Sequence, residues 1–241
     1  MHDYLIVIPA RLGSTRLPRK PLADINGKPM LQHTVERALE VAPREQVFIA
    51  TDSEEVRDLC QGFQVQVEMT SSACLTGTDR VAEFATRHPA QIYVNLQGDE
   101  PFMPAENIRM IVEAGLAHPT EVVNGWSWID KEEDWRSRNV PKVIIREDGT
   151  LMYMSRAPIP GNKSDTFEFA RRQVCVYSFP AKALKDFIAK PRKTEHEAIE
   201  DIEILRFVEM GFQVRMIELE GGFISVDTPE DLRLVRTESV V

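Results

Sequence analysis

The chain has 241 residues, 43% of them hydrophobic, and a formal net charge of −9. This acidity argues against a general nucleic-acid-binding protein, which would carry a basic face, and the apolar runs fall well short of the ~20 residues of a membrane-spanning helix. Three cysteines without metal-ligand spacing predict neither a zinc site nor a disulfide framework. Because "MHDYLIVIPA" has no basic leader, we expect a first strand there and a cytoplasmic protein.

Short β-rich runs alternate with helix-like stretches over the first half of the chain. The strand-like runs are "YLIVIP", "QVFIAT", "FQVQVEM" and "QIYVNLQ", and the helical stretches are 29–40, 54–61, 79–87 and 104–117. Strands joined through helices of this length predict an α/β fold with a mostly parallel sheet. Ligands bind beyond the carboxyl ends of such strands. We therefore expect the chemistry in the loops after Ile8, at Thr51-Asp52 and at 97–101.

The pattern changes at about residue 125. Strand-like "PKVIIR", "TLMYMSR" and "RQVCVYSF" surround a polar segment, which predicts a smaller subdomain at 126–193 beside a core of 1–125 and 194–241. After it we expect one amphipathic helix over 197–210, a strand in "FQVRMIEL", and a last helix that Thr228 caps and Pro229 begins.

Positive charge concentrates in the loop after the first strand, where Arg11, Arg16, Arg19 and Lys20 lie beside a Gly and a Ser. Phosphate oxygens are held by such a combination of backbone N–H groups and cationic side chains. The ordinary alternative is a solvated basic loop, but the number of cations and the stiffening prolines favour a triphosphate site. The loop matches neither a P-loop nor a G-x-G-x-x-G fingerprint, which argues against a P-loop kinase and a dehydrogenase.

Two acidic positions follow strands that are far apart in the chain. Asp99 lies in "NLQGDEP" and Asp227 in "SVDTPED". Taken singly, the first is explained by a Gly-Asp turn and the second by a helix N-terminus. Beside a phosphate loop, the pair predicts a Mg²⁺ site for phosphoryl or nucleotidyl transfer, because Mg²⁺ takes few carboxylates and otherwise binds water and phosphate oxygens.

Four further residues have both a functional and an ordinary interpretation. Thr78 and Arg80 in "TGTDR" are candidates for a pocket wall, although capping of the next helix explains Thr78 equally well. Lys142 and Arg156 flank strands and are either ligands for a carboxylate or surface cations. The five histidines show no paired spacing and no Ser lies in a G-x-S-x-G elbow, which argues against a histidine metal cluster and a hydrolytic triad.

Six ordered motifs cover nearly the whole chain: "IPARLGSTRLPRKPLADINGKPMLQHTVERA", "IATD", "MTSSACLTGTDR", "VNLQGDEP", "YMSRAPIP" and "VDTPEDL". Together they resemble the 3-deoxy-manno-octulosonate (Kdo) cytidylyltransferase family. The resemblance implies a three-layer αβα nucleotide-diphospho-sugar transferase fold, a homodimer, and a role in lipopolysaccharide or capsule synthesis. It also implies transfer of CMP from CTP to the anomeric hydroxyl of Kdo or a related acidic sugar, with release of pyrophosphate.

The resemblance further implies roles for single residues. The triphosphate would be bound by Arg11, Arg16 and Lys20, and the rest of the nucleotide would be bound with the help of Thr78, Arg80 and Gln97. Mg²⁺ would be bound by Asp99 and Asp227. The catalytic residues would be Lys20, Arg11, Asp99 and Asp227. The residues that face the sugar acid would be Lys142, Arg156, Gln173 and Glu203.

Three positions depart from the family's pattern. Arg19 stands where the family reads Gly, so we expect the loop backbone to avoid conformations that only Gly tolerates. Gln173 replaces a His and Ile204 a Gln, which leaves the identity of the sugar open. The alternatives are a same-fold nucleotidyltransferase acting on a nonulosonic acid, a polyol phosphate or a phosphonate and, from another class, a non-catalytic nucleotide-binding regulatory module.

Overall fold

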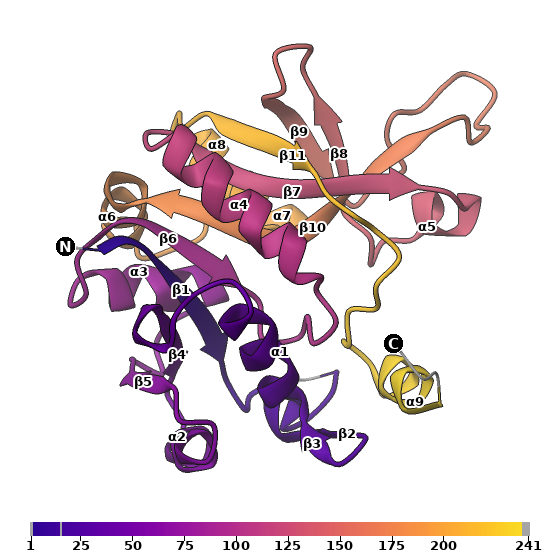
Figure 1. Ribbon diagram of the computed structural model, residues 1–241. Coiled ribbons are helices and arrows are strands. Elements are labelled where there is room, and N and C mark those ends of the chain that lie inside the picture. The colour runs from indigo at the N-terminus through magenta and orange to yellow at the C-terminus, as the bar shows by residue number, and fades with distance from the viewer. Residues whose placement is uncertain (1, 15, 238–241) are drawn as a thin grey trace.

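One central sheet organises the chain, which the computed structural model describes over residues 2–14 and 16–237 (Figure 1). Its main strands, in hydrogen-bonded order, are β11 (Val214–Glu218), β7 (Val122–Ile129), β10 (Ala170–Pro180), β6 (Ala90–Leu96), β1 (His2–Ala10), β4 (Val47–Thr51) and β5 (Gln66–Met69). All neighbours pair in parallel except β10, which runs antiparallel to both β6 and β7. The predicted mostly parallel α/β sheet is confirmed.

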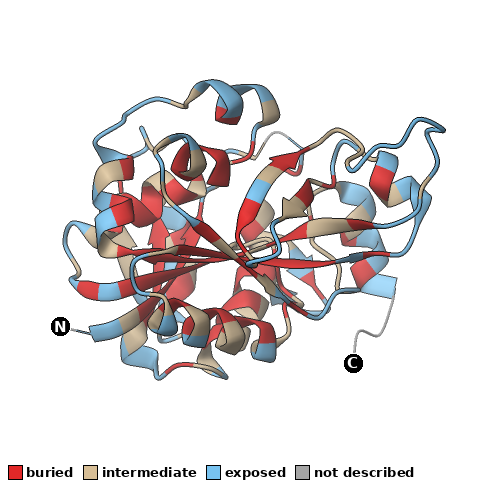
Figure 2. Ribbon diagram, turned by 90° about the horizontal axis from the view of Figure 1, so that it is seen from above, coloured by how far each residue is buried: buried red, intermediate tan, exposed pale blue. Residues whose placement is uncertain are grey.

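Helices cover both faces of this sheet. One face packs against α1 (Met30–Leu39), α2 (Glu54–Gln61) and α4 (Ala105–Ala117), and the other against α3 (Gly77–Ala85), α6 (Ala181–Ile188) and α8 (Ile204–Glu209). Figure 2 shows the buried strands between helices whose outer sides are exposed. Along β1, Leu5 and Val7 belong to one apolar cluster and Ile6 and Ile8 to the other, because successive side chains of a strand point to opposite faces. The three-layer αβα arrangement is thus confirmed.

Shorter elements complete the chain. These are the 3₁₀ turns η1 (Lys20–Leu22) and η2 (Arg44–Gln46), the small hairpin of β2 (Asp24–Ile25) and β3 (Lys28–Pro29), α5 (Glu132–Arg136), the hairpin of β8 (Lys142–Ile145) and β9 (Leu151–Ser155), α7 (Glu195–Glu200) and α9 (Pro229–Thr237). Thr228 Oγ1 accepts a hydrogen bond from the Asp231 N–H at 3.2 Å, so the predicted cap of the last helix is present. None of the helices in the described ranges is long and apolar enough to cross a membrane.

The single helix expected over 197–210 is wrong. The chain forms α7 and α8 instead, separated at Asp201, whose φ of 52° and ψ of 49° lie in the left-handed region. A residue with this backbone conformation cannot continue a right-handed helix. The break turns the segment after Glu200 toward the sheet.

The expected boundaries of the subdomain also differ from the structure. Residues 126–193 include the β8–β9 hairpin, which projects beyond the main sheet in Figure 1, but also β10 and α6. β10 pairs with both β6 and β7 inside the main sheet, and α6 packs on its face. These two elements therefore belong to the core, and the separate segment is confined to about the hairpin and its flanking loops.

Candidate active site

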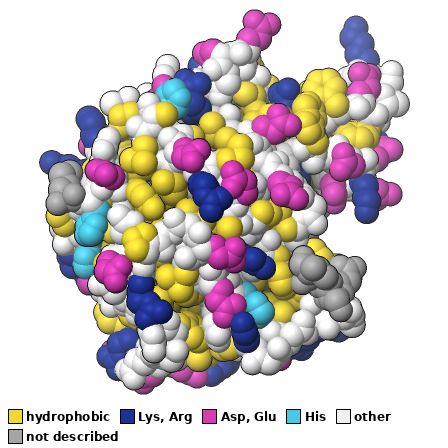
Figure 3. Space-filling model, in the orientation of Figure 1, with side chains coloured by type: hydrophobic (Ala, Val, Ile, Leu, Met, Phe, Trp, Pro, Cys, Tyr) yellow, Lys and Arg dark blue, Asp and Glu magenta, His cyan; other side chains and the backbone are white. Residues whose placement is uncertain are grey.

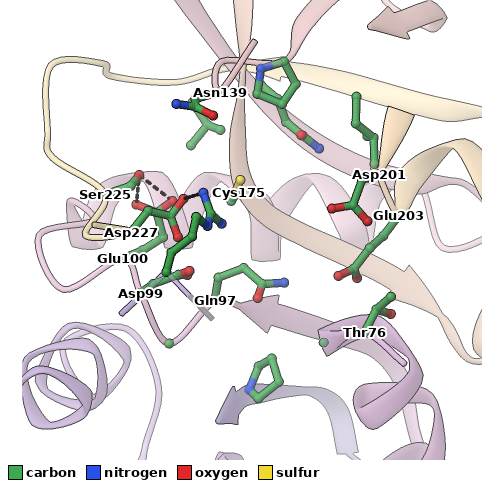
Figure 4. A pocket seen from close by; sticks show the side chains of 18 of the residues that line it. Thr76, Gln97, Asp99, Glu100, Asn139, Cys175, Asp201, Glu203, Ser225 and Asp227 are labelled. Atoms are coloured by element: carbon green, nitrogen blue, oxygen red, sulfur yellow. Dashed lines mark hydrogen bonds and ion pairs between the residues drawn. The ribbon is translucent and has the colours of Figure 1, made fainter. Parts of the chain in front are cut away.

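A cleft of about 1160 Å³ lies beyond the carboxyl ends of β1 and β6, as expected for a sheet of this type. Its walls come from the loop after β1, the start of α3, the loop after β6, one side of β10, the loop before β8, and the segment that leads into α9. In Figure 4, Asp99, Glu100, Ser225 and Asp227 gather on one side, Asp201 and Glu203 lie on the opposite side, and Gln97 lies between.

The cleft collects positive charge in a chain whose net charge is −9. Eight cationic residues line it against six acidic ones: Arg11, Arg16, Lys20, Arg80, Arg138, Arg156, Arg172 and Lys193, and Asp99, Glu100, Asp201, Glu203, Asp227 and Asp231. On the face shown in Figure 3, by contrast, acidic and basic side chains are interspersed. The local excess of cations suits a small anionic ligand.

Lys20 is the centre of the charged cluster. Its Nζ lies 2.5 Å from Asp99 Oδ2 and 2.8 Å from Asp227 Oδ1, and Arg16 Nη1 lies 3.1 Å from Asp227 Oδ2. Burial alone would lower the pKa of Lys20, but the two carboxylates outweigh it and raise that pKa. Burial would likewise raise the pKa of Asp227, yet the charges of Lys20 and Arg16 lower it. Lys20 and Asp227 are therefore both charged at neutral pH.

Hydrogen bonds between two distant segments explain why Asp99 and Asp227 meet. The Val226 N–H donates to the Asp99 carbonyl at 3.0 Å, and Ser225 Oγ lies 2.8 Å from each carboxyl oxygen of Glu100. Glu100 is only 3% exposed; this burial and then the charge of Asp99 raise its pKa to about 8. Sequence reasoning did not find Glu100 and Ser225, although "GDEP" and "ISVD" place them beside the predicted carboxylates.

The expectation for Arg19 is wrong. Arg19 has φ 59° and ψ 29°, the left-handed conformation that favours glycine, and its N–H donates to the Leu12 carbonyl at 3.3 Å. Its guanidinium forms an ion pair with Glu55 of α2. The opening loop thus keeps a glycine-like turn although the residue is arginine, and the turn directs Lys20 into the cleft.

The start of α3 forms a second wall. Thr76 and Asp79 cap the helix reciprocally, and Gly77 lies so close to Gln97 that a Cβ atom would be 3.1 Å from its Oε1. Gln97 lines the cleft as predicted. Arg80 also reaches it, although only 2% of Arg80 is exposed, and it is held by an ion pair with Asp52 at 3.2 Å.

Thr78 lies behind this wall rather than on it. It is 1% exposed, its N–H donates to Glu203 Oε2 at 2.9 Å, and its hydroxyl accepts from Asn95 Nδ2 at 3.4 Å. Glu203 itself lines the cleft, and burial raises the pKa of its carboxyl group. Thr78 therefore positions Glu203, and the expected direct contact of its side chain with a nucleotide is not supported.

Lys142 also differs from the expectation. It is fully buried, and its ammonium donates to the carbonyls of Ser137, Val140 and Arg156 at 2.6–2.8 Å. Burial, followed by the nearby charges of Arg138 and Arg156, lowers its pKa to about 8. With its three donors used, Lys142 ties the loop before β8 to the end of β9 and does not face the cleft.

Arg156 and the break between α7 and α8 hold each other in place. The Arg156 guanidinium donates to the carbonyls of Glu200, Asp201 and Arg138 at 2.5, 3.0 and 2.9 Å, while the Glu200 carboxylate accepts from the Arg156 N–H at 2.8 Å. Arg156 thereby joins three segments on the side of the cleft expected to receive the sugar. Ile204 is 1% exposed and packs in the core, so its side chain is not part of that wall.

The donor set at Lys20 fits a divalent cation. Two carboxylate oxygens, one each from Asp99 and Asp227, lie within 2.8 Å of one nitrogen atom, so they converge on one point next to the cationic loop. Mg²⁺ commonly uses one or two protein carboxylates and takes its other ligands from phosphate and water. Among the described residues there is no cluster of three or more His, Cys, Asp or Glu that could hold a metal, so phosphate or water would have to complete the coordination.

Comparison with known proteins agrees with this geometry. A family model described as cytidylyltransferase matches residues 5–218. The 3-deoxy-manno-octulosonate cytidylyltransferases of Chlorobium chlorochromatii (strain CaD3) and Geobacter sulfurreducens are 36% and 40% identical, over 98% and 95% of this chain and 96% of each relative. A solved structure of CMP:2-keto-3-deoxy-manno-octonic acid synthetase in complex with CTP superposes with a TM-score of 0.90 and 34% identity, covering 97% of both chains.

Fold, cleft and family model together define a nucleotidyltransferase of the cytidylyltransferase class. Within that class, the resemblance found in the six sequence motifs is confirmed by similarity along nearly the full length. The chain belongs to the family of 3-deoxy-manno-octulosonate cytidylyltransferases.

Proposed function

We propose that this protein transfers CMP from CTP to the anomeric hydroxyl of Kdo, or of a closely related acidic sugar, and releases pyrophosphate. The observation that carries the proposal is the position of Lys20 between Asp99 and Asp227, on the wall of a cleft lined by eight cationic residues. The names of the curated relatives and of the CTP-bound neighbour support the same substrates.

In this proposal the chain acts mainly by positioning and charge neutralisation. The triphosphate is bound by Arg11, Arg16 and Lys20. The sugar carboxylate is bound by cationic residues on the other side of the cleft, where Arg156 lies. The anomeric oxygen forms a bond to the α-phosphorus while the bond between the α-phosphorus and the pyrophosphate oxygen breaks. Positive groups that face the departing pyrophosphate favour this step because negative charge accumulates there.

We assign the metal role to Asp99 and Asp227, whose carboxylates converge. Mg²⁺ bound there would neutralise charge on the triphosphate and lower the pKa of a coordinated hydroxyl. In the structure Lys20 occupies the space between the two carboxylates, so binding of a cation requires its ammonium to turn toward the triphosphate.

The direct test is release of pyrophosphate from CTP in the presence of Kdo and Mg²⁺, with CTP binding measured separately. Asp227→Asn should retain CTP binding and lose roughly 10²–10³ in turnover, the size of effect seen when one charge-stabilising group is removed. Asp186→Asn is a matched control, because Asp186 of α6 pairs with Lys182 and does not line the cleft. Unchanged turnover of Asp227→Asn would remove this residue from the metal role.

The alternative functions differ in which acceptor, if any, supports release of pyrophosphate from CTP. A panel of 8-amino-Kdo, nonulosonic acids, polyol phosphates and phosphonates distinguishes a same-fold enzyme with another acceptor. A regulatory module would bind CTP and release no pyrophosphate with any of these compounds. Because Asp99 and Asp227 are both directed at one point beside the cationic loop, we favour the enzyme.

The expected homodimer and cytoplasmic location stay proposals. An apolar surface supports the first: Trp128 of β7 is 45% exposed and stacks edge-on against Phe169, which is 52% exposed, at 6.5 Å between ring centroids. We propose that a second copy covers this surface. Sedimentation of Phe169→Glu should then show a smaller particle than the parent protein, and equal masses would exclude this surface. A role in lipopolysaccharide or capsule synthesis follows only if Kdo is the substrate.

A further inference from the structure

A chain of buried amide groups ends at Gln173 on the wall of the cleft. We propose that Gln173 presents only its carbonyl oxygen, Oε1, to the sugar acid, and that it thereby selects a substrate group that donates a hydrogen bond, either a hydroxyl or an ammonium. The inference rests on the proposed function and identifies a specificity-determining residue within it.

The chain of amides begins at an irregularity of β10. The register between β10 and β7 shifts between Val174, which pairs with Gly125, and Tyr177, which pairs with Asn124. In this interval the carbonyl oxygens of Val174 and Val176 both face the Asn124 side chain, and Asn124 Nδ2 lies 2.9 and 3.0 Å from them. A backbone carbonyl can only accept hydrogen bonds. The Asn124 amide is therefore fixed with its nitrogen toward β10.

The orientation of Asn124 dictates that of Gln173. Asn124 is completely buried, and its Oδ1 lies 3.1 Å from the amide of Gln173. Since Asn124 Oδ1 can only accept, the facing atom of Gln173 must be its nitrogen Nε2. The second N–H of Nε2 is directed at the Tyr177 hydroxyl, 3.2 Å away. Both amide protons of Gln173 are thus used inside the protein.

One polar atom of Gln173 is left for a ligand. Gln173 is 7% exposed and lines the cleft, and no group in residues 2–14 or 16–237 donates a hydrogen bond to its Oε1. A sugar that covers this oxygen must supply a donor of its own, because an unpaired buried acceptor is costly. A substrate atom that can only accept is therefore disfavoured at this point.

The experiment compares substitutions that change hydrogen bonding and little else. Pyrophosphate release is measured with Kdo and with analogues in which one hydroxyl at a time, other than the anomeric hydroxyl that reacts, is replaced by fluorine, which cannot donate, or by an amino group, which can. We expect one ring or side-chain position at which the fluoro analogue loses roughly 10- to 100-fold in kcat/KM and the amino analogue keeps most of it.

A variant of the acceptor itself provides the second arm. Gln173→Met keeps the length of the side chain and removes both polar atoms. At the sensitive position, the preference of this variant for hydroxyl over fluorine should fall below about threefold, while its KM for CTP stays unchanged, since Gln173 is not among the groups assigned to the triphosphate. Binding of CTP and the thermal unfolding midpoint of the variant show whether it is folded.

The outcomes separate this inference from the proposed function. If the parent enzyme releases pyrophosphate with Kdo but distinguishes no fluoro analogue from its hydroxyl counterpart, the selection by Gln173 is refuted and the function stands. A Gln173→Met variant that keeps the full preference also refutes it. If no sugar acid supports pyrophosphate release, the proposed function itself is refuted, and the inference about Gln173 falls with it. The measurements on the parent enzyme test the inference even where the variant does not fold.

Discussion

The buried ion pair between Glu197 and Arg206 offers a quantitative test of the break between α7 and α8. Both side chains are completely buried, and the guanidinium binds both carboxylate oxygens at 2.6 Å. Nine residues of continuous helix would separate the two by about 13 Å along the axis. They meet only because the chain reverses at Asp201. The pair also reaches the cleft wall, since Arg206 Nη1 lies 3.0 Å from Asp79, which caps α3.

Arg206→Met should be severely destabilising. It keeps most of the side-chain volume but leaves the Glu197 carboxylate buried without its partner, a change that costs about 3–5 kcal/mol of the free energy of unfolding. In a protein of this size, that corresponds to a fall in the unfolding midpoint of about 6–20 °C. Equilibrium unfolding in urea measures the first quantity and a thermal melt the second.

Two comparisons make the result decisive. Arg233→Met is the matched control, because Arg233 pairs with Glu230 where both side chains are about 70% exposed, and it should change the free energy of unfolding by less than about 1 kcal/mol. Combining Arg206→Met with Glu197→Gln should recover at least half of the loss, since no buried charge is then stranded. If the free energy of unfolding of Arg206→Met lies within about 1 kcal/mol of that of the parent protein, the reasoning is refuted.

Three other changes have defined outcomes. Lys142→Met should lower kcat/KM for the sugar acid about tenfold with KM for CTP unchanged, because the ammonium holds the loop before β8 through three carbonyls; an effect on CTP alone would contradict this. Arg19→Gly removes left-handed strain of about 1–2 kcal/mol but adds freedom to the unfolded chain, so urea unfolding should shift by less than about 1 kcal/mol. Burial would raise the pKa of Glu209, but hydrogen bonds from His196 and from the Glu197 N–H help to outweigh it, and the pKa is lowered to about 2. The resulting stability is present above the carboxyl's ordinary pKa and is lost as pH falls toward 2. In Glu209→Gln, the decrease in the free energy of unfolding over this pH range should therefore be smaller by about 1–2 kcal/mol, after allowance for solvent screening. Urea unfolding at successive pH values measures this decrease.

Much of the site was predictable because it follows from the geometry of parallel sheets. The loop after β1 and the one after β6 share an edge since β1 and β6 are parallel neighbours, and this brings Lys20 and Asp99 together. The convergence of Asp227 was inferred only from the resemblance and from the need for a second carboxylate. Its physical cause, the hydrogen bonds of Ser225 and Val226 to the loop after β6, involves no recognisable local pattern.

The errors arose where tertiary contacts outweighed local preference. The amphipathic pattern of 197–210 fits a helix, but burial of the Glu197–Arg206 pair stabilises the reversal at Asp201. At Arg19, contacts of the loop and the ion pair with Glu55 accompany a backbone conformation that the sequence disfavours. Lys142 was expected to face the sugar acid, and its burial could not be predicted because its acceptors are backbone carbonyls, which leave no signature in the sequence.

The antiparallel strand β10 has a consequence for the order of assembly. β6 and β7 follow each other in the chain, yet β10 lies between them in the sheet, so the two have no direct hydrogen-bonded link. During synthesis the segment through β6 can collapse with its helices, whereas β7 must wait about forty residues for its neighbour. The half of the sheet that carries β7 and β11 is therefore joined late, and until β10 arrives both β6 and β7 expose an open edge on which a chaperone or a second nascent chain can act.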